Sequence, residues 1–110
     1  MNELETALLR EVTGGVEPQL CLRTKTRVDA GLWLRRSPLW LCVTESQLIL
    51  LAVAKRRYLQ VVDLMECWSS HYCQATGEFI IAPAEGLEYG RVAMSPAEAV
   101  AVYRMILKGL

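Results

Sequence analysis

Residues 39–53 read LWLCVTESQLILLAV, two apolar runs separated by a short polar segment. Thr44, Glu45 and Ser46 predict a turn between two strands. Gln47–Val53 is almost continuously apolar and has the length of a strand, so it predicts a strand that is buried in the fold.

The segment before this pair of strands, residues 20–28, alternates with a period of two. One face of the expected strand carries Leu20, Leu22, Thr24, Thr26 and Val28, and the other carries Cys21, Arg23, Lys25 and Arg27. This pattern predicts one face on a core and one in water. A turn is expected at residues 29–31, and Pro38 predicts an edge, a bulge or a break within residues 32–43.

Further short strands are expected after the apolar run. They cover residues 58–62, 67–72, 79–82 and 87–94, with turns at 55–57, 74–77 and 83–86 and a loop at 63–66. Gly77 suits the left-handed conformation that a hairpin requires. Six or seven short strands at a spacing of about 8–12 residues predict a sandwich or barrel rather than a parallel sheet.

Helices are expected at both ends. Leu4, Leu8 and Val12, with Ala7, define one face of a helix that begins after Asn2 and ends at Gly14-Gly15. At the other end, Ser95-Pro96-Ala97-Glu98 has the pattern of a capping box, in which the Ser hydroxyl and the Glu carboxylate each bind a free backbone N–H. A C-terminal helix is therefore expected from Ser95.

The composition fits a folded domain. The chain has 110 residues, 53% of them hydrophobic, and a formal net charge of zero. These values exclude intrinsic disorder and a globally basic nucleic-acid binder. The charge is uneven along the chain, because residues 20–57 carry a balance of +6 and each flank carries −3.

The N-terminal segment lacks the basic start and apolar run of a signal peptide, and the longest apolar run is far shorter than the roughly 20 residues that span a bilayer. The four cysteines contain no C-x-x-C pair; they are Cys21, Cys42, Cys67 and Cys73. We therefore expect a cytoplasmic protein with reduced, buried cysteines.

This order of elements resembles the pleckstrin-homology (PH) superfold, and more specifically bacterial PH-like and GRAM-like domains. The matching segments are Leu39-Trp40-Leu41-Cys42-Val43-Thr44 followed by Leu48-Ile49-Leu50-Leu51, then Lys55-Arg56-Arg57, Thr76-Gly77-Glu78-Phe79 and Ser95-Pro96-Ala97-Glu98-Ala99. The resemblance covers about residues 17–108.

The resemblance implies an α+β, mainly β fold: a bent antiparallel PH-like barrel of six to seven strands, capped by a C-terminal helix. The N-terminal helix is an addition to that fold. We expect one domain over residues 1–110, with the N-terminal helix at 1–15, the barrel at 17–94 and the C-terminal helix at 95–108.

The candidate binding residues are basic and lie on the first predicted hairpin: Arg23, Lys25, Arg27, Arg35 and Arg36. Several cations within reach of one point suit a phosphate through charge-assisted contacts, and many PH domains bind phosphoinositides on this hairpin. The alternative is a solvated strand face without a ligand. Lys55-Arg56-Arg57 either extends this patch or blunts an exposed edge.

Other chemistry is disfavoured. Cys67, Ser69, His71 and Cys73 share one face of a predicted strand but lack the convergent spacing of a structural zinc site. A nucleophile and its base are not expected at Ser69, Ser70 and His71, which are too close in sequence and lie on alternating faces. A glycosidase carboxylate pair is not expected at Glu85 and Glu88, which flank a turn. We expect no metal, cofactor, nucleic acid or enzymatic activity.

Aromatic side chains leave two interpretations open. Trp33, Trp40, Trp68 and Tyr72 are either core residues or an aromatic binding patch, and Trp33 is of most interest because it is close to Arg35 and Arg36.

The sequence hypothesis is a non-enzymatic PH-like binding or scaffold module, which acts through a protein partner or as a homo-oligomer. The apolar excess and the N-terminal helix favour this reading, because that helix packs either on its own barrel or on a neighbouring subunit. The alternative is binding of anionic lipid headgroups at a membrane surface, or of a phosphorylated ligand, through the basic hairpin.

Overall fold

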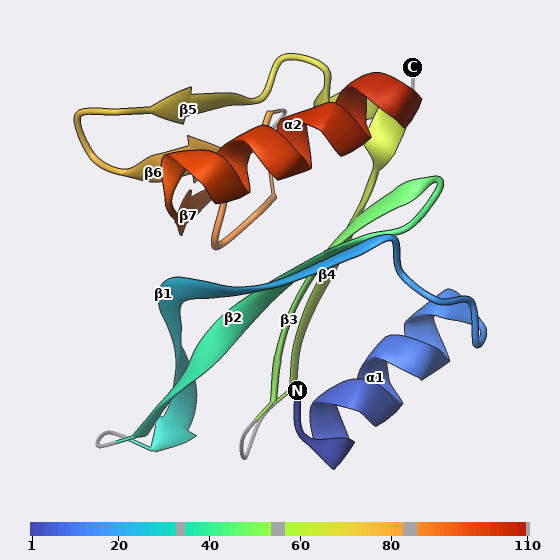
Figure 1. Cartoon of the computed structure of the whole chain (residues 1–110). Helices are drawn as coiled ribbons and strands as arrows, with labels where there is room; N and C mark the ends of the chain where they lie inside the picture. Colours follow the sequence, from blue (N-terminus) through green and yellow to red (C-terminus); the bar gives the residue numbers. More distant parts are fainter. Residues whose placement is uncertain (33–34, 54–56, 83–85, 110) are drawn as a thin grey trace.

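Two antiparallel sheets and two helices make up the computed structural model of the chain (Figure 1). It describes residues 1–32, 35–53, 57–82 and 86–109; of residues 29–32, 35, 36 and 109 it describes the backbone. The first sheet has the order β1-β2-β3-β4 and the second the order β5-β6-β7. The elements are α1 Glu3–Thr13, β1 Leu20–Leu32, β2 Arg35–Val43, β3 Gln47–Val53, β4 Arg57–Asp63, the 3-10 helix η1 Leu64–Cys67, β5 His71–Cys73, β6 Glu78–Ile80, β7 Arg91–Ala93 and α2 Pro96–Gly109.

The four-stranded sheet has apolar side chains on both faces. Figure 1 shows α1 below this sheet, with α2 and the three-stranded sheet above it. The side chains of β3 alternate between two cores. Leu48, Leu50 and Ala52 belong to the core that includes α2. Ile49, Leu51 and Val53 belong to a second core, between the sheet and α1. The apolar run of β3 is continuous because neither face of the strand is left to water.

The predicted turn at Thr44-Glu45-Ser46 is confirmed. The backbone N–H of Thr44 donates to the carbonyl of Gln47 at 2.9 Å, and the Thr44 hydroxyl accepts the N–H of Gln47 at 3.1 Å. Beyond the turn, β2 and β3 pair from Val43 opposite Leu48 to Trp40 opposite Leu51.

A bulge bends β1 and brings it to the second sheet. Arg23 is paired with Trp40 and Arg27 with Pro38, so three residues of β1 face one residue of β2. Inside the bulge the Thr24 hydroxyl donates to the carbonyl of Leu39 at 2.7 Å, and the Thr26 hydroxyl accepts the N–H of Ala93 in β7 at 2.7 Å. Figure 1 shows the sharp bend of β1, with β7 above the corner.

The expected barrel is not closed. Among the described residues the strands form two separate ladders, and the contact between β1 and β7 is the Thr26–Ala93 bond rather than a strand pairing. The α+β class, the seven antiparallel strands and the terminal helices are as expected, but the closed barrel is wrong. The physical reason is the length of β5, β6 and β7, which have three residues each and offer too little edge to pair with the first sheet.

The extents of several strands differ from expectation. β1 continues through residues 29–31, where a second register shift replaces the expected turn. Of the alternatives expected at Pro38, the break does not occur, because β2 continues through it; Pro38 lies beyond the segment that pairs with β3, where the sheet has an edge and no N–H is needed. Cys67 lies in η1 rather than on a strand with His71, and β7 spans only Arg91–Ala93.

The helix caps agree with the sequence. Asn2 caps α1, Gly14 ends it with φ of 66°, and α2 begins with reciprocal bonds between Ser95 and Glu98 of 3.0 and 3.2 Å. The expected face of α1 is confirmed for Leu8, which is buried, and for Val12, which packs against the core, but it is wrong for Leu4 and Ala7, which are exposed, while Glu5 and Leu9 are buried instead. The helix is rotated because the Glu5 carboxylate accepts the indole N–H of Trp40 at 2.7 Å.

Candidate interaction surfaces

The basic face of β1 is exposed, as the alternation predicts. Arg23, Lys25 and Arg27 all lie at the surface, whereas Thr24 and Val28 are buried. Arg23 and Arg27 are four residues apart in β1, but their partners in β2, Trp40 and Pro38, are only two residues apart because of the bulge. Two residues of a strand span about 7 Å. The backbone positions of Arg23 and Arg27 are therefore closer together than four residues of a regular strand would place them.

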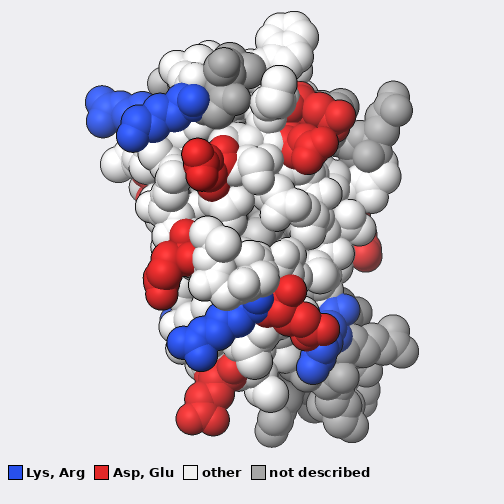
Figure 2. Space-filling view, turned by 90° about the vertical axis from the view of Figure 1, so that its right-hand side faces the viewer, with Lys and Arg blue, Asp and Glu red and all other residues white. Residues whose placement is uncertain are grey.

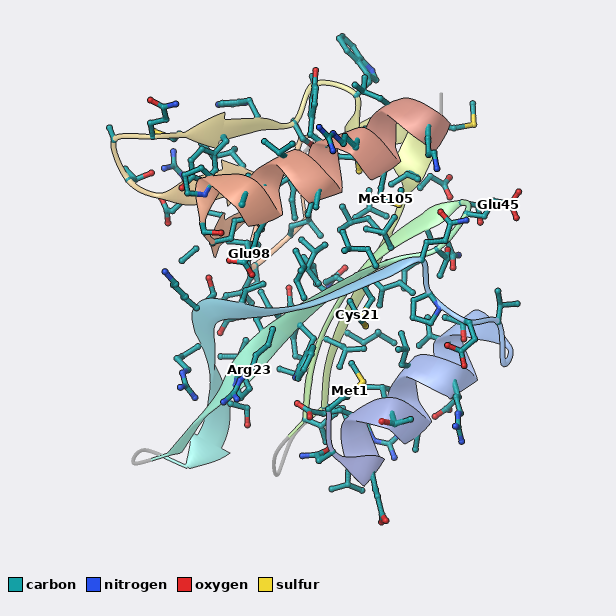
Figure 3. The ribbon with its side chains drawn as sticks, in the orientation of Figure 1. Met1, Cys21, Arg23, Glu45, Glu98 and Met105 are labelled. Carbon is teal, nitrogen blue, oxygen red and sulfur yellow. The ribbon has the colours of Figure 1, made fainter. Side chains whose placement is uncertain are left out.

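This cationic cluster, which we define as Arg23, Lys25 and Arg27, has no carboxylate partner within ion-pair distance among the described residues. The ion pairs found there are Arg57 with Glu11 at 3.6 Å and Arg91 with Glu78 at 3.4 Å. Figure 3 shows Arg23 on the side of the sheet that also carries α1. Arg35 and Arg36 belong to β2 by their backbone, but their side chains, together with Trp33 and residues 55 and 56, lie outside the described part of the structure.

A second surface combines α2 and η1, which pack against each other. Its members are apolar side chains with 40–68% of their area exposed: Met65, Trp68, Val100, Tyr103 and Leu107. Val100, Tyr103 and Leu107 are spaced three and four residues apart, so they form one stripe on the side of α2 that its buried residues leave free. We call these five residues the α2–η1 surface.

Charges of both signs border the α2–η1 surface. Asp63 and Glu66 are exposed at the two ends of η1, and Arg104 and Lys108 are exposed on the second half of α2. A depression of about 390 Å³ beside η1 is lined by Asp63, Leu64, Met65 and Glu66, together with Glu45 and Ser46 of the β2–β3 turn. A polar border around exposed apolar side chains is typical of a protein interface.

The uneven charge of the sequence does not give separate poles on the face seen in Figure 2. There Lys and Arg lie beside Asp and Glu at both ends of the molecule. The ion pair of Arg57 with Glu11 is one example, because it joins the basic middle segment to the acidic N-terminal segment.

The aromatic residues have different roles. Trp40 is half-buried against α1 and bonds Glu5, whereas Trp68 is 65% exposed. Tyr72 is partly buried, and its hydroxyl donates to the carbonyl of Met94 at 2.9 Å. Trp33 was of most interest from the sequence because it is close to Arg35 and Arg36, whereas the position of Trp68 just after a 3-10 helix has no strong sequence signal.

The metal and catalytic candidates are not brought together. Cys67 is buried in η1 and His71 is exposed on β5, and among the described residues no three His, Cys, Asp or Glu side chains are placed to hold a metal ion. Ser70 is buried and has a structural role, since its hydroxyl accepts the N–H of Ala82 at 2.9 Å.

The cysteines are free but not uniformly buried. Cys42 and Cys67 are buried, Cys73 is partly exposed and Cys21 is exposed, so the expectation of four buried thiols is wrong. Burial raises the pKa of Cys67 to about 11. The pKa of the Cys73 thiol is lowered by a hydrogen bond from the side chain of Thr76.

Comparison with known proteins gives no match: no family model, no curated protein and no solved structure is significantly similar to this chain. Neither of the helices, over the residues described, is long and apolar enough to cross a membrane.

Proposed function

We propose that this chain is a cytoplasmic, non-enzymatic PH-like binding module that self-assembles, with a second copy of the chain bound at the α2–η1 surface. The observation that carries the proposal is the exposure of Trp68 and Met65, about two thirds of each side chain, at η1, the element that packs against α2 and its exposed apolar stripe. Trp is enriched at the centres of protein interfaces because it buries a large area with few rotatable bonds.

The order of the elements supports the PH-like part of the proposal. Four antiparallel strands, three further strands and a final amphipathic helix follow one another, and β1 bends strongly at its bulge. The added helix α1 packs on its own sheet through Leu8 and Leu9, so it is not the segment offered to a partner.

A second copy is favoured over an unrelated protein because the α2–η1 surface carries both signs of charge. An isologous interface places the same patch on both subunits, so attraction requires cations and carboxylates within that one patch. Arg104 and Lys108 provide the cations and Asp63 and Glu66 the carboxylates, and none of the four is in an ion pair among the described residues.

Light scattering after size-exclusion chromatography tests self-assembly. The weight-average mass of the wild-type chain is expected to rise with concentration toward that of a dimer, and Leu107→Glu or Trp68→Ser is expected to restore the monomer. Leu4→Glu is the matched control, because Leu4 is equally exposed but lies on α1. A strict monomer at the highest concentration, or dimerisation unchanged in the Leu107 and Trp68 variants, contradicts the proposal.

Charge reversal gives a sharper test of the occupant. Lys108→Glu or Glu66→Lys alone is expected to weaken the dimer, and the two together are expected to recover part of the loss. Binding between unlike charges also weakens as salt is added. If neither reversal changes the dimer, the α2–η1 surface is not the contact.

A second candidate function is binding of an anionic phosphate group at the cationic cluster. It is favoured by the bulge that brings the backbone positions of Arg23 and Arg27 closer together, in a cluster without a described carboxylate partner. The phosphate group belongs either to a lipid headgroup or to a free phosphorylated compound. Flotation with phosphatidylcholine vesicles that contain phosphatidylserine tests the lipid, and calorimetry with free inositol hexakisphosphate tests the soluble compound, both at low salt. Triple reversal of the cluster to Glu is expected to abolish binding, and absence of binding to either probe contradicts this candidate.

A further inference from the structure

Cys21 of β1 and Cys42 of β2 lie directly opposite each other in the first sheet. The hydrogen-bond pattern defines the kind of pair they form. Thr44 bonds Gln47 of β3 through its backbone, and alternate residues of an antiparallel strand bond to the same neighbour, so Cys42 also directs its N–H and carbonyl toward β3. Cys21 and Cys42 are therefore a non-hydrogen-bonded pair, the closer of the two types.

The geometry of such a pair suits a disulfide. The two Cα atoms of a non-hydrogen-bonded pair are about 4.5 Å apart, within the range of about 4.4–6.8 Å that disulfides occupy. Residues directly opposite each other also direct their side chains to the same face of the sheet. The Cys21 and Cys42 side chains therefore leave the same face of the sheet from directly opposite positions.

The two thiols have unequal surroundings. Cys21 lies on an edge strand and is exposed, and Figure 3 shows it on the α1 side of the sheet. Cys42 is fully buried among Leu8, Leu9 and Ile49 beneath α1. Interaction with the Cys42 side chain lowers the pKa of Cys21, and the same interaction together with burial raises the pKa of Cys42. Cys21 is thus the accessible thiol of the pair and the one that ionises more readily.

We propose that Cys21 and Cys42 form a thiol oxidation site, which a peroxide converts to an intramolecular disulfide between β1 and β2. The Cys21 thiolate attacks one oxygen of hydrogen peroxide, the O–O bond breaks, and the released hydroxide takes a proton to become water. The product is the sulfenic acid of Cys21. The Cys42 sulfur then attacks the Cys21 sulfur, the S–O bond breaks, and a second water leaves with the Cys42 proton. In total the dithiol loses two electrons and two protons, and the peroxide is reduced to two waters.

The other two cysteines lack this arrangement. Cys67 is buried, and its S–H donates to the carbonyl of Asp63 at 3.5 Å. Cys73 is partly exposed, but the residue paired with it on β6 is Glu78 and not a cysteine. The site is therefore specific to one pair of the four thiols, and it is independent of self-assembly at the α2–η1 surface.

Peptide mapping of the full chain tests the proposal. The reduced protein is treated with hydrogen peroxide, alkylated, and digested with trypsin without reduction. The expected product is residues 11–23 joined to residues 37–55, lighter by two hydrogen atoms than the sum of the free peptides. Alkylatable thiols in the unfolded product fall from four to two. A disulfide that includes Cys67 or Cys73, a link between two chains, or four intact thiols after oxidation overturns the proposal.

Variants separate the two steps. Cys42→Ser is expected to stop at the sulfenic acid, which dimedone labels at Cys21, whereas Cys21→Ser is expected to lose both the label and the disulfide. Cys73→Ser is the matched control and keeps the disulfide, because Cys73 is also partly exposed with a lowered pKa. Strong dimedone labelling of Cys21 in the wild-type chain contradicts the role of Cys42, and this result does not depend on whether a Cys42 variant folds.

Discussion

The Glu5 carboxylate joins the start of α1 to the first sheet and gives the sharpest stability prediction. It is 4% exposed, and its two oxygens accept different donors: Oε1 accepts the backbone N–H of Asn2 at 2.9 Å and Oε2 accepts the indole N–H of Trp40 at 2.7 Å. Glu5→Gln keeps the size of the side chain but leaves one acceptor oxygen for these two donors. One N–H then faces the amide NH₂ and loses its partner.

The magnitude follows from the charge of the acceptor. A hydrogen bond to a charged group contributes about 1.5–3 kcal/mol, so we expect Glu5→Gln to lower the free energy of unfolding by about 2 kcal/mol. Trp40→Phe removes the same bond from the other side. In the Trp40→Phe background the amide turns its NH₂ toward the vacated position, so Glu5→Gln costs well under about 1 kcal/mol more. The expected coupling energy is therefore about 1.5 kcal/mol.

Urea unfolding of the wild type, the two single variants and the double variant measures this cycle. Glu3→Gln is the control, because Glu3 lies in the same first turn but is exposed. It is expected to lose only the interaction with the helix dipole, about 0.3–1 kcal/mol. A coupling energy below about 0.5 kcal/mol would refute the reasoning, since well-separated sites show additivity to that level.

Three further predictions concern α1, the bend in β1 and a buried thiol. Leu8→Ala is expected to cost about 2–5 kcal/mol in urea unfolding and Leu4→Ala less than about 0.5 kcal/mol, because only Leu8 is buried; equal losses would contradict the observed helix face. Thr26→Val leaves the N–H of Ala93 without its acceptor, so amide exchange at Ala93 is expected to accelerate and stability to fall by about 1–3 kcal/mol, whereas unchanged exchange would exclude the Thr26–Ala93 link. Because burial raises the pKa of Cys67 to about 11, little of its thiolate exists at pH 8, so iodoacetamide is expected to label it slowly in the native chain and faster as the pH rises; labelling at pH 8 as fast as in urea would contradict its burial.

The sequence predicts local features better than distant ones. The turn at Thr44 and the caps at Asn2 and Ser95 are predictable because each depends on residues within four positions of one another. The buried run of β3 is predictable from its apolarity together with its length, because a short continuous apolar run fits a strand that is covered on both faces.

The features that were missed depend on distant contacts. A helical stripe of apolar residues includes Leu4, but the bond between Glu5 and Trp40, thirty-five residues apart, rotates the helix away from it. The bulge in β1 depends on Thr26 reaching Ala93, sixty-seven residues away. The basic alternation correctly placed Arg23, Lys25 and Arg27 at the surface, but it gave no sign of the bulge that brings the positions of Arg23 and Arg27 closer together.

The α2–η1 surface was also missed, because an exposed stripe and a buried stripe have the same chemistry in a sequence. Val100 and Val102 are both apolar residues of one helix, yet the first is 49% exposed and the second is fully buried. Only the position of α2 over the sheets distinguishes them. Hydrophobicity alone therefore indicated that this chain has an apolar excess, without indicating where the excess lies.

The two apolar faces of β3 affect the fidelity of folding. In an ordinary surface strand, a slip of one residue exposes the hydrophobic set and is strongly penalised. In β3 the same slip exchanges Leu48, Leu50 and Ala52 for Ile49, Leu51 and Val53, and the polar side chain that changes sides is that of Gln47 at the start of the strand. A misregistered strand would thus remain hydrophobic apart from this residue. The hydrophobic pattern of β3 therefore does little to select the native register. The hydrogen bonds of the turn from Thr44 to Gln47 fix which residues of β2 and β3 are paired.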